Sequence, residues 1–283
     1  MQLALGTAQF GMDYGITNQT GQVSQKEIEE ILMLCKDSGI VDLDTAISYG
    51  SSEANLGEVL QGDDHFRITT KIPSDTTENV TRLIEESLSR LNVDKLDAIL
   101  FHSADGLLGD RAKERYQMLR DLKDQGYTNH IGVSVYKPCE LTRIEHEFEI
   151  EAMQYPANLL DQRFVGFDHK PNQRVFVRSI FLQGVLLNLD EKIYCQFPDH
   201  RGILQQVLSF RDKFSLSPMA SCLAIRFLLP ESTSLVVGCC TKLELDEIVS
   251  TYQSLSELPE VAAAIPDLAT TDERLIMPIH WSA

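Results

Sequence analysis

The feature that most constrains the fold of this chain is a repeated alternation between short, apolar segments and longer amphipathic segments. Eight apolar segments are candidates for strands, at residues 3–6, 41–44, 67–71, 97–102, 130–135, 151–155, 175–180 and 234–238. Several are apolar along nearly their whole length, which is typical of parallel strands that are buried on both faces. We therefore expect a parallel sheet covered by helices.

The segments between these strands carry the start signals and the period of helices. Ser24 and Glu27 have the spacing of a capping box, and Ser217 with Pro218 is typical of a helix start. The apolar residues of two such segments share one helical face each: Ile28, Ile31, Leu32 and Cys35, and then Val80, Leu83, Ile84 and Leu91. Eight strands alternating with helices, without a flexible linker, favour an α/β fold of the (β/α)8 TIM barrel type over an open doubly wound sheet. We expect residues 1–283 to form a single barrel domain.

The charge of the chain excludes several classes of partner. Its 25 basic and 42 acidic residues give a formal net charge of −17, with no cluster of Lys and Arg. Nucleic acid and anionic membranes would be repelled, and no apolar segment is long enough to span a bilayer. The N-terminal segment also lacks the basic leader of a signal peptide. We expect a cytoplasmic protein that binds neither nucleic acid nor membrane, and its oligomeric state stays open.

The six cysteines predict neither a metal site nor a disulfide framework. They are scattered, without a CxxC pair and without a histidine at the spacing of a zinc site. The adjacent Cys239 and Cys240 are more typical of packing residues than of a redox pair. We expect no metal and a reducing compartment.

Barrels of this class build their sites at the carboxyl ends of the strands. Asp44, Lys71 and His102 end three consecutive predicted strands, and Tyr49 lies in the loop after the second. We interpret these four residues as one catalytic group. In it Lys71 lowers the pKa of the Tyr49 phenol, Asp44 keeps Lys71 charged, and His102 hydrogen-bonds the substrate oxygen. Taken singly, Asp44, Lys71 and His102 have structural explanations as a cap, a solvent-reaching lysine and a core histidine. Their joint occurrence, together with Tyr49, favours catalysis.

At these residues the chain resembles the aldo-keto reductase superfamily. DTAISYGSSEANLG, residues 44–57, is similar to the signature that follows the second strand of that family, and TTK and LFH end at the family's two other catalytic positions. IGVSVY, MQYPANLLD and SLVVGCCTKLELDEI resemble its later strands and its last cofactor-binding helix. The resemblance covers nearly the whole chain.

The resemblance implies a nicotinamide cofactor, NAD(H) or NADP(H), and a small-molecule carbonyl or alcohol as substrate. Tyr49 would be the general acid in carbonyl reduction and the general base in alcohol oxidation. The positions that match cofactor contacts are Thr7, Ser134, Gln154, Arg178, Ser179, Gly238, Glu244 and Glu247. A sugar or sugar derivative is one candidate substrate, because GTAQFGMDYGITNQTGQ near the N-terminus is similar to a bacterial subgroup associated with cell-surface carbohydrate synthesis.

The sequence departs from the family pattern at four of these positions or beside them. Val135 and Ile248 replace asparagines, Arg178 replaces an aromatic residue that stacks on the nicotinamide, and Glu244 replaces an Arg or Gln near the 2′-phosphate. Glu244 also has the spacing of a capping box with Thr241, a purely structural role. A carboxylate in that place predicts weak discrimination between the two cofactors, with NADH used at least as well as NADPH.

Two other functions stay open at the level of sequence. Lys71 at a strand end could form a Schiff base in a lyase or aldolase, although a carboxylate partner would keep it protonated. The chain could also be a sensor or regulatory protein that binds the cofactor and turns over negligibly.

Overall fold

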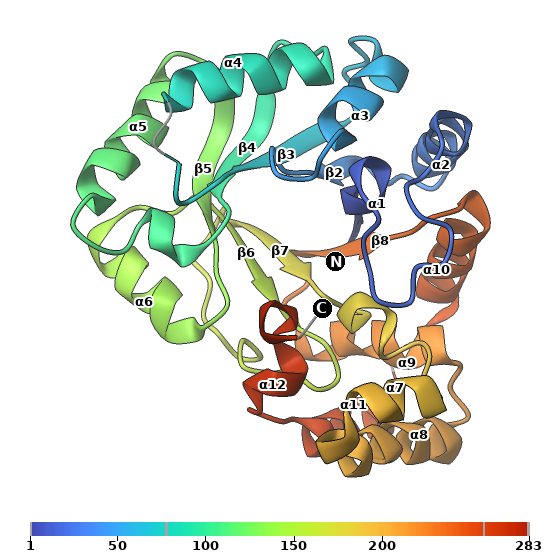
Figure 1. The fold of residues 1–283 in the computed structure, drawn as a ribbon. Helices are drawn as coiled ribbons and strands as arrows, with labels where there is room; N and C mark the ends of the chain where they lie inside the picture. The colour runs from blue at the N-terminus through green and yellow to red at the C-terminus, as the bar shows by residue number, and fades with distance from the viewer. Residues whose placement is uncertain (1, 77–78, 257, 282–283) are drawn as a thin grey trace.

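The computed structural model describes residues 2–76, 79–256 and 258–281. Within these ranges, eight parallel strands close a barrel in chain order (Figure 1). They are β1 Gln2–Gly6, β2 Asp42–Asp44, β3 Arg67–Ile72, β4 Leu96–Phe101, β5 Thr128–Ser134, β6 Ala152–Pro156, β7 Arg174–Arg178 and β8 Thr233–Gly238. The predicted (β/α)8 barrel is confirmed, and each strand ends within two residues of its expected place.

Twelve α-helices occur among the described residues, and most of them form the outer layer around the barrel (Figure 1). They are α1 Ala8–Gly11, α2 Gln25–Asp37, α3 Ser52–Leu60, α4 Val80–Leu91, α5 Ala112–Asp124, α6 Pro138–Glu147, α7 Glu191–Gln196, α8 Arg201–Phe214, α9 Pro218–Leu223, α10 Lys242–Ser254, α11 Pro259–Ala264 and α12 Glu273–Ile276. Residues 157–173, all of them described, form no helix, so the connection from β6 to β7 breaks the alternation. None of the described helices is long and apolar enough to cross a membrane.

The helices pack through the apolar faces that the sequence predicts. The four predicted face residues of α4 are buried, and so are those of α2. Ser24 caps α2 by accepting a hydrogen bond from the Glu27 N–H, and Ser217 caps α9 in the same way from Ala220. These faces turn toward the strands and form one large apolar core between the two layers.

The side chains inside the barrel are charged at its amino end and apolar in its middle. Since side chains alternate along a strand, Asp42 and Asp44 lie on the same face of β2, one nearer each end of the barrel. At the amino end, Asp42 forms ion pairs with Arg67 and Arg174. Apolar side chains from β1, β7 and β8 (Ala4, Phe176 and Val236) fill the middle. The amino end is thus closed by structural ion pairs, which leaves the carboxyl end for a site.

Candidate active site

A pocket of about 740 Å³ opens at the carboxyl end of the barrel. The loops after β1, β2, β7 and β8 form most of its wall, and the C-terminal segment contributes Pro278 and Ile279. Eight predicted site residues line it: Thr7, Asp44, Tyr49, His102, Arg178, Ser179, Gly238 and Glu244. Lys71, Ser134 and Gln154 are buried and do not reach the cavity. Glu247 lies on the exposed side of α10, outside the wall.

Lys71 and Asp44 form the buried centre of the site. The Lys71 ammonium donates hydrogen bonds of 2.8 Å to both carboxylate oxygens of Asp44 and to the backbone oxygen of Thr45. Gln154 donates a further bond of 2.7 Å to Asp44 Oδ1. Burial lowers the pKa of Lys71, and Asp44 opposes that shift. All three ammonium hydrogens are therefore committed to protein acceptors.

Tyr49 is held by a close contact between two backbone segments. Gly50 has φ of +57°, and a Cβ there would come within 2.3 Å of the Gly11 backbone oxygen. The loop after β2 can therefore pass tightly over α1 only with a glycine at this position. The contact fixes the loop that carries the Tyr49 ring at the edge of the pocket.

The Tyr49 phenol lies near two cations and bonds to neither. Lys71 Nζ lies 5.1 Å from the centroid of its ring, and the hydroxyl has no hydrogen-bond partner among the described residues. Burial raises the pKa of Tyr49, Asp44 raises it further, and Arg178 lowers it. The phenol is thus kept protonated at neutral pH and its hydroxyl is free to bond a ligand.

His102 completes the group as a neutral imidazole. Its Nδ1 lies 3.0 Å from the Ser48 hydroxyl, and its ring meets the Tyr49 ring edge-on, with centroids 5.7 Å apart. Burial and the charges of Lys71 and Arg178 lower the pKa of His102 to about 3. If Ser48 donates to Nδ1, the ring proton is on Nε2, where it can be donated to a substrate oxygen.

Two features of the site fit a nicotinamide dinucleotide. The Gln154 side-chain oxygen is buried without a partner in the described structure, and a carboxamide N–H is the kind of donor that it would accept. Ile180 and Phe181 line the pocket, and their backbone N–H groups have no acceptor among the described residues. Free backbone N–H groups are typical ligands of phosphate oxygens. Because Gln154 and Ser134 lie behind the wall, a carboxamide reaches them only if the wall rearranges.

The start of α10 is occupied by two carboxylates of the protein. Glu244 accepts a hydrogen bond of 2.6 Å from the Cys240 N–H, and Thr241 accepts one from the Glu244 N–H, which confirms the capping role that the spacing predicts. Glu27 accepts a bond of 2.5 Å from the Lys242 N–H. The expectation that Glu27 completes the cap of its own helix is therefore wrong, because its carboxylate reaches the N-terminus of a different helix.

Sequence reasoning missed several residues of the pocket. Tyr14 and Tyr136 line it, and Ser48 contacts His102. Tyr136 carries a usable signal, since it follows a predicted strand end by one residue. Tyr14 lies in an irregular loop, whose conformation cannot be predicted from a periodic pattern. The hydrogen bond from the Lys242 N–H to Glu27 joins residues 215 positions apart, so no local sequence pattern indicates it.

The fold is a closed (β/α)8 barrel, and its carboxyl end carries a group of Tyr, Lys, Asp and His side chains. These features define a class of barrel proteins whose site residues can transfer protons. Residues 2–263 match the model of the Aldo/keto reductase family, and the chain belongs to this family.

Individual relatives are distant. A methylglyoxal reductase, DkgA, from Yersinia pestis is 31% identical over 130 residues, 44% of this chain and 46% of that protein. An uncharacterized oxidoreductase of Schizosaccharomyces pombe is 29% identical over 161 residues, 53% of this chain and 54% of its own length. The chain thus matches about half the length of these curated relatives.

Solved structures share the fold over nearly the whole chain. An aldo-keto reductase from Bacillus halodurans, in its holo form, superposes with a TM-score of 0.74 at 16% identity, covering 99% of this chain and 95% of that one. A glycerol dehydrogenase from Gluconobacter oxydans gives a TM-score of 0.69 at 20% identity, covering 98% and 92%.

Proposed function

We propose that this protein is an NAD(P)-dependent oxidoreductase that interconverts a carbonyl and an alcohol on a small molecule. One observation carries the proposal. The free Tyr49 hydroxyl and the neutral His102 ring lie side by side at the wall of a pocket, and a fully paired Lys71 lies behind them. This arrangement suits proton transfer at one oxygen atom of a bound molecule.

Each residue then has a distinct task in carbonyl reduction. Tyr49 donates its proton to the carbonyl oxygen, and His102 donates a hydrogen bond to the same oxygen. Asp44 holds Lys71 in place beside the phenol ring, where its charge stabilises the phenolate that forms. The nicotinamide, when bound, supplies or accepts the hydride. In alcohol oxidation the phenolate takes the proton back.

The geometry counts against a Schiff-base lyase. An amine attacks a carbonyl through a free lone pair, whereas the Lys71 hydrogens are bonded to Asp44 and Thr45. The side chain is also 0% exposed, so no substrate carbonyl reaches it from the pocket.

For the cofactor, we propose that NADH is used at least as well as NADPH. In the family, the start of the last cofactor-binding helix meets the adenosine end of the cofactor, and here that start carries the carboxylates of Glu27 and Glu244. Both already bind backbone N–H groups that a 2′-phosphate would otherwise use, and both repel its charge.

The test is a screen of aldehydes, ketoses and aldoses in both directions with NADH and NADPH, with Tyr49→Phe as the control. Turnover that depends on Tyr49 supports the proposal, and sugars among the best substrates would support the carbohydrate expectation. Tight cofactor binding without turnover on any compound would point instead to the sensor function.

A further inference from the structure

We infer that Arg178 is an anion-binding residue of the substrate subsite, so that the natural substrate carries a carboxylate or phosphate besides its reacting group. The inference rests on the proposed function, since the anion belongs to the molecule that Tyr49 protonates. Arg178 ends β7, is half-buried and lines the same pocket as Tyr49 and His102.

The guanidinium is held in place mainly by stacking, with few of its donors used. It lies over the Tyr136 ring, with Cζ 4.1 Å from the ring centroid. Its hydrogen bonds are long, 3.2 Å to the Ser179 hydroxyl and 3.4 Å to the Val135 backbone oxygen. Because a guanidinium has five N–H donors in a fixed planar fork and only two of them are used, in-plane donors remain for a bidentate contact with a carboxylate or phosphate.

Arg178 has no countercharge in the described structure. No described carboxylate lies within ion-pair distance of it, and it is the only Lys or Arg among the described residues that line the pocket. The two acidic residues of the wall are occupied, Asp44 by Lys71 and Glu244 by the Cys240 N–H. In a chain of net charge −17, an unpaired, half-buried guanidinium is an uncommon feature. A ligand anion is the partner that would balance it.

The position of Arg178 relative to the reacting group is also suitable. Its charge lowers the pKa of both Tyr49 and His102, so it lies within electrostatic range of the two groups that meet the substrate oxygen. An anion held there would remain apart from the proton donor and yet belong to the same small molecule. The substrate class is therefore a short oxo acid, a sugar acid or a phosphorylated carbonyl compound.

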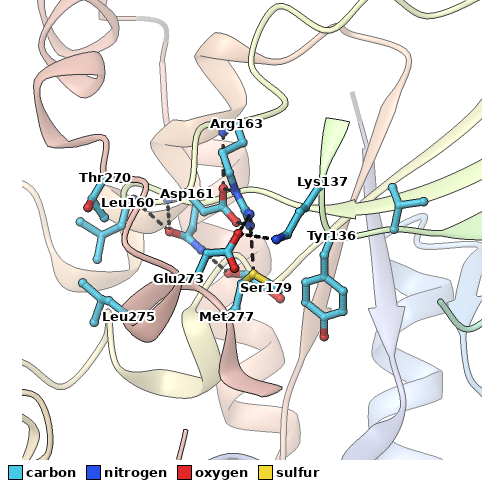
Figure 2. A network of polar contacts seen from close by, with 12 residues as sticks. Tyr136, Lys137, Leu160, Asp161, Arg163, Ser179, Thr270, Glu273, Leu275 and Met277 are labelled. Carbon is cyan, nitrogen blue, oxygen red and sulfur yellow. Dashed lines mark hydrogen bonds and ion pairs between the residues drawn. The ribbon is translucent and has the colours of Figure 1, made fainter. Parts of the chain in front are cut away.

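The Tyr136 ring, on which Arg178 stacks, belongs to a segment that a separate polar network anchors. Tyr136 and Lys137 donate their backbone N–H groups to the Glu140 carboxylate. Figure 2 shows how the next link is made: the Lys137 ammonium lies 2.6 Å from Glu273, which belongs to the C-terminal helix α12. Arg163 connects the same helix to Asp161 in the connection after β6. The backbone that carries the Tyr136 ring is thus held by contacts to two other chain segments.

Binding of simple anions tests the inference without requiring turnover. Protein-detected NMR titrations with butyrate, its neutral isostere butyramide and inorganic phosphate would be run on the protein alone and with saturating NADH. We expect an anion to bind about tenfold or more tightly than butyramide, as for hydrogen bonds to a charged group. Arg178→Gln should reduce this ratio to about one, and Arg178→Lys should keep part of it.

Arg226 provides the matched control. Its guanidinium also stacks on a tyrosine, with Cζ 4.4 Å from the Tyr252 ring centroid, but it lies outside the pocket wall. Arg226→Gln should leave the anion preference unchanged. A wild-type protein that binds neither anion more tightly than butyramide would overturn the inference, whether or not the protein proves to be a reductase.

Paired substrates then distinguish the two kinds of anion and exclude the cofactor as the partner. Succinic semialdehyde against butanal tests a carboxylate, and glyceraldehyde 3-phosphate against glyceraldehyde tests a phosphate. Arg178→Gln should lower the ratio of kcat/KM for the preferred anionic member to that for its neutral partner by about tenfold or more. The ratio is the readout, because loss of the Arg178 charge also changes the pKa of Tyr49 and His102 for both substrates. If it instead weakens NADH binding and leaves the anion preference intact, Arg178 binds a cofactor phosphate and the inference is wrong.

Discussion

Lys71 lies 5.1 Å from the centre of the Tyr49 ring, yet it donates none of its hydrogens to that tyrosine. The ammonium is anchored to Asp44 and Thr45, so it can stabilise charge on the phenol only through space. Lys71, which carries the positive charge, is therefore a different residue from Tyr49, which we propose to transfer the proton. Substitution of each measures its contribution separately.

Removal of the Tyr49 hydroxyl should abolish turnover and leave the pocket intact. For Tyr49→Phe we expect kcat to fall by about 10²- to 10⁴-fold, the usual contribution of a general acid, with a cofactor Kd close to that of the wild type. Steady-state kinetics and cofactor fluorescence titration measure the two quantities. A variant that keeps more than about a tenth of the wild-type kcat would mean that another group donates the proton.

The Asp44 and Lys71 pair should show strong coupling in stability. Either Asp44→Asn or Lys71→Met leaves one buried charge without its partner, and we expect each to lower the free energy of unfolding by about 3–5 kcal/mol. The double variant should cost clearly less than the sum of the two. Urea unfolding of the four proteins gives the coupling energy, and additive losses would show that the two side chains do not depend on each other.

His102 should make the protein less stable in acid. Its pKa is about 3 in the folded state against about 6.5 for a free imidazole, so the unfolded chain binds the extra proton between these values. Stability from this residue is complete above pH 6.5 and decreases as the pH falls toward 3. Between pH 6.5 and 5 the loss is about 2 kcal/mol. His102→Asn should remove that part of the pH dependence of urea unfolding, and an unchanged dependence would mean that the imidazole is not held neutral.

The cofactor preference should change with the charge at the start of α10. We expect the wild type to bind NADH at least as tightly as NADPH, and Glu244→Arg to shift the Kd ratio toward NADPH by about tenfold, because the substitution exchanges a repulsive group for a donor. Asp246→Arg makes the same change of charge on the exposed side of α10, outside the pocket wall, and should have little effect. A strong wild-type preference for NADPH that Glu244→Arg leaves unchanged would place the 2′-phosphate elsewhere.

Gly50, the glycine beside Tyr49, should tolerate no side chain. In Gly50→Ala, a methyl group at positive φ would lie 2.3 Å from the Gly11 oxygen, so we expect a loss of about 1–3 kcal/mol in stability together with reduced kcat. Gly202→Ala in α8 is the matched control, since a Cβ there meets nothing within 4 Å, and it should be neutral or stabilising. Equal effects of the two substitutions would show that the Gly50 contact does not position the loop.

The barrel and the strand-end residues could be predicted because both depend on local patterns. The apolar segments and helical periods predict the bounds of the strands to within two residues. A residue at the end of a strand, such as Asp44 or Lys71, is then predicted to lie at the carboxyl end of the barrel. The largest difference is at the end of β7. The sequence predicts a strand over residues 175–180, but the strand ends at Arg178 because the backbone of Ser179 has a φ of +64°.

Contacts between distant segments could not be predicted in this way. The bond from Gln154 to Asp44 joins residues 110 positions apart, and the stacking of Arg178 on Tyr136 depends on the directions in which two loops leave the barrel. Nothing in the local sequence distinguishes these side chains from solvent-exposed ones. For the same reason Ser134 and Gln154 could be matched to a cofactor contact by position, whereas their burial behind the pocket wall could not be foreseen.

The loop after β1 meets the loop after β7 across the mouth of the pocket. The Thr17 hydroxyl bonds the Gln183 backbone oxygen at 3.4 Å, and a Cβ on Gly184 would lie 1.8 Å from that hydroxyl. The Gln183 side-chain amide also donates a hydrogen bond of 3.5 Å to the Tyr14 hydroxyl. The two loops therefore form a bridge that two long hydrogen bonds help to close. A ligand that extends beneath such a bridge enters and leaves only when the bridge opens. We therefore expect the two loops to set the rate of ligand exchange and the residues of the barrel to set the affinity.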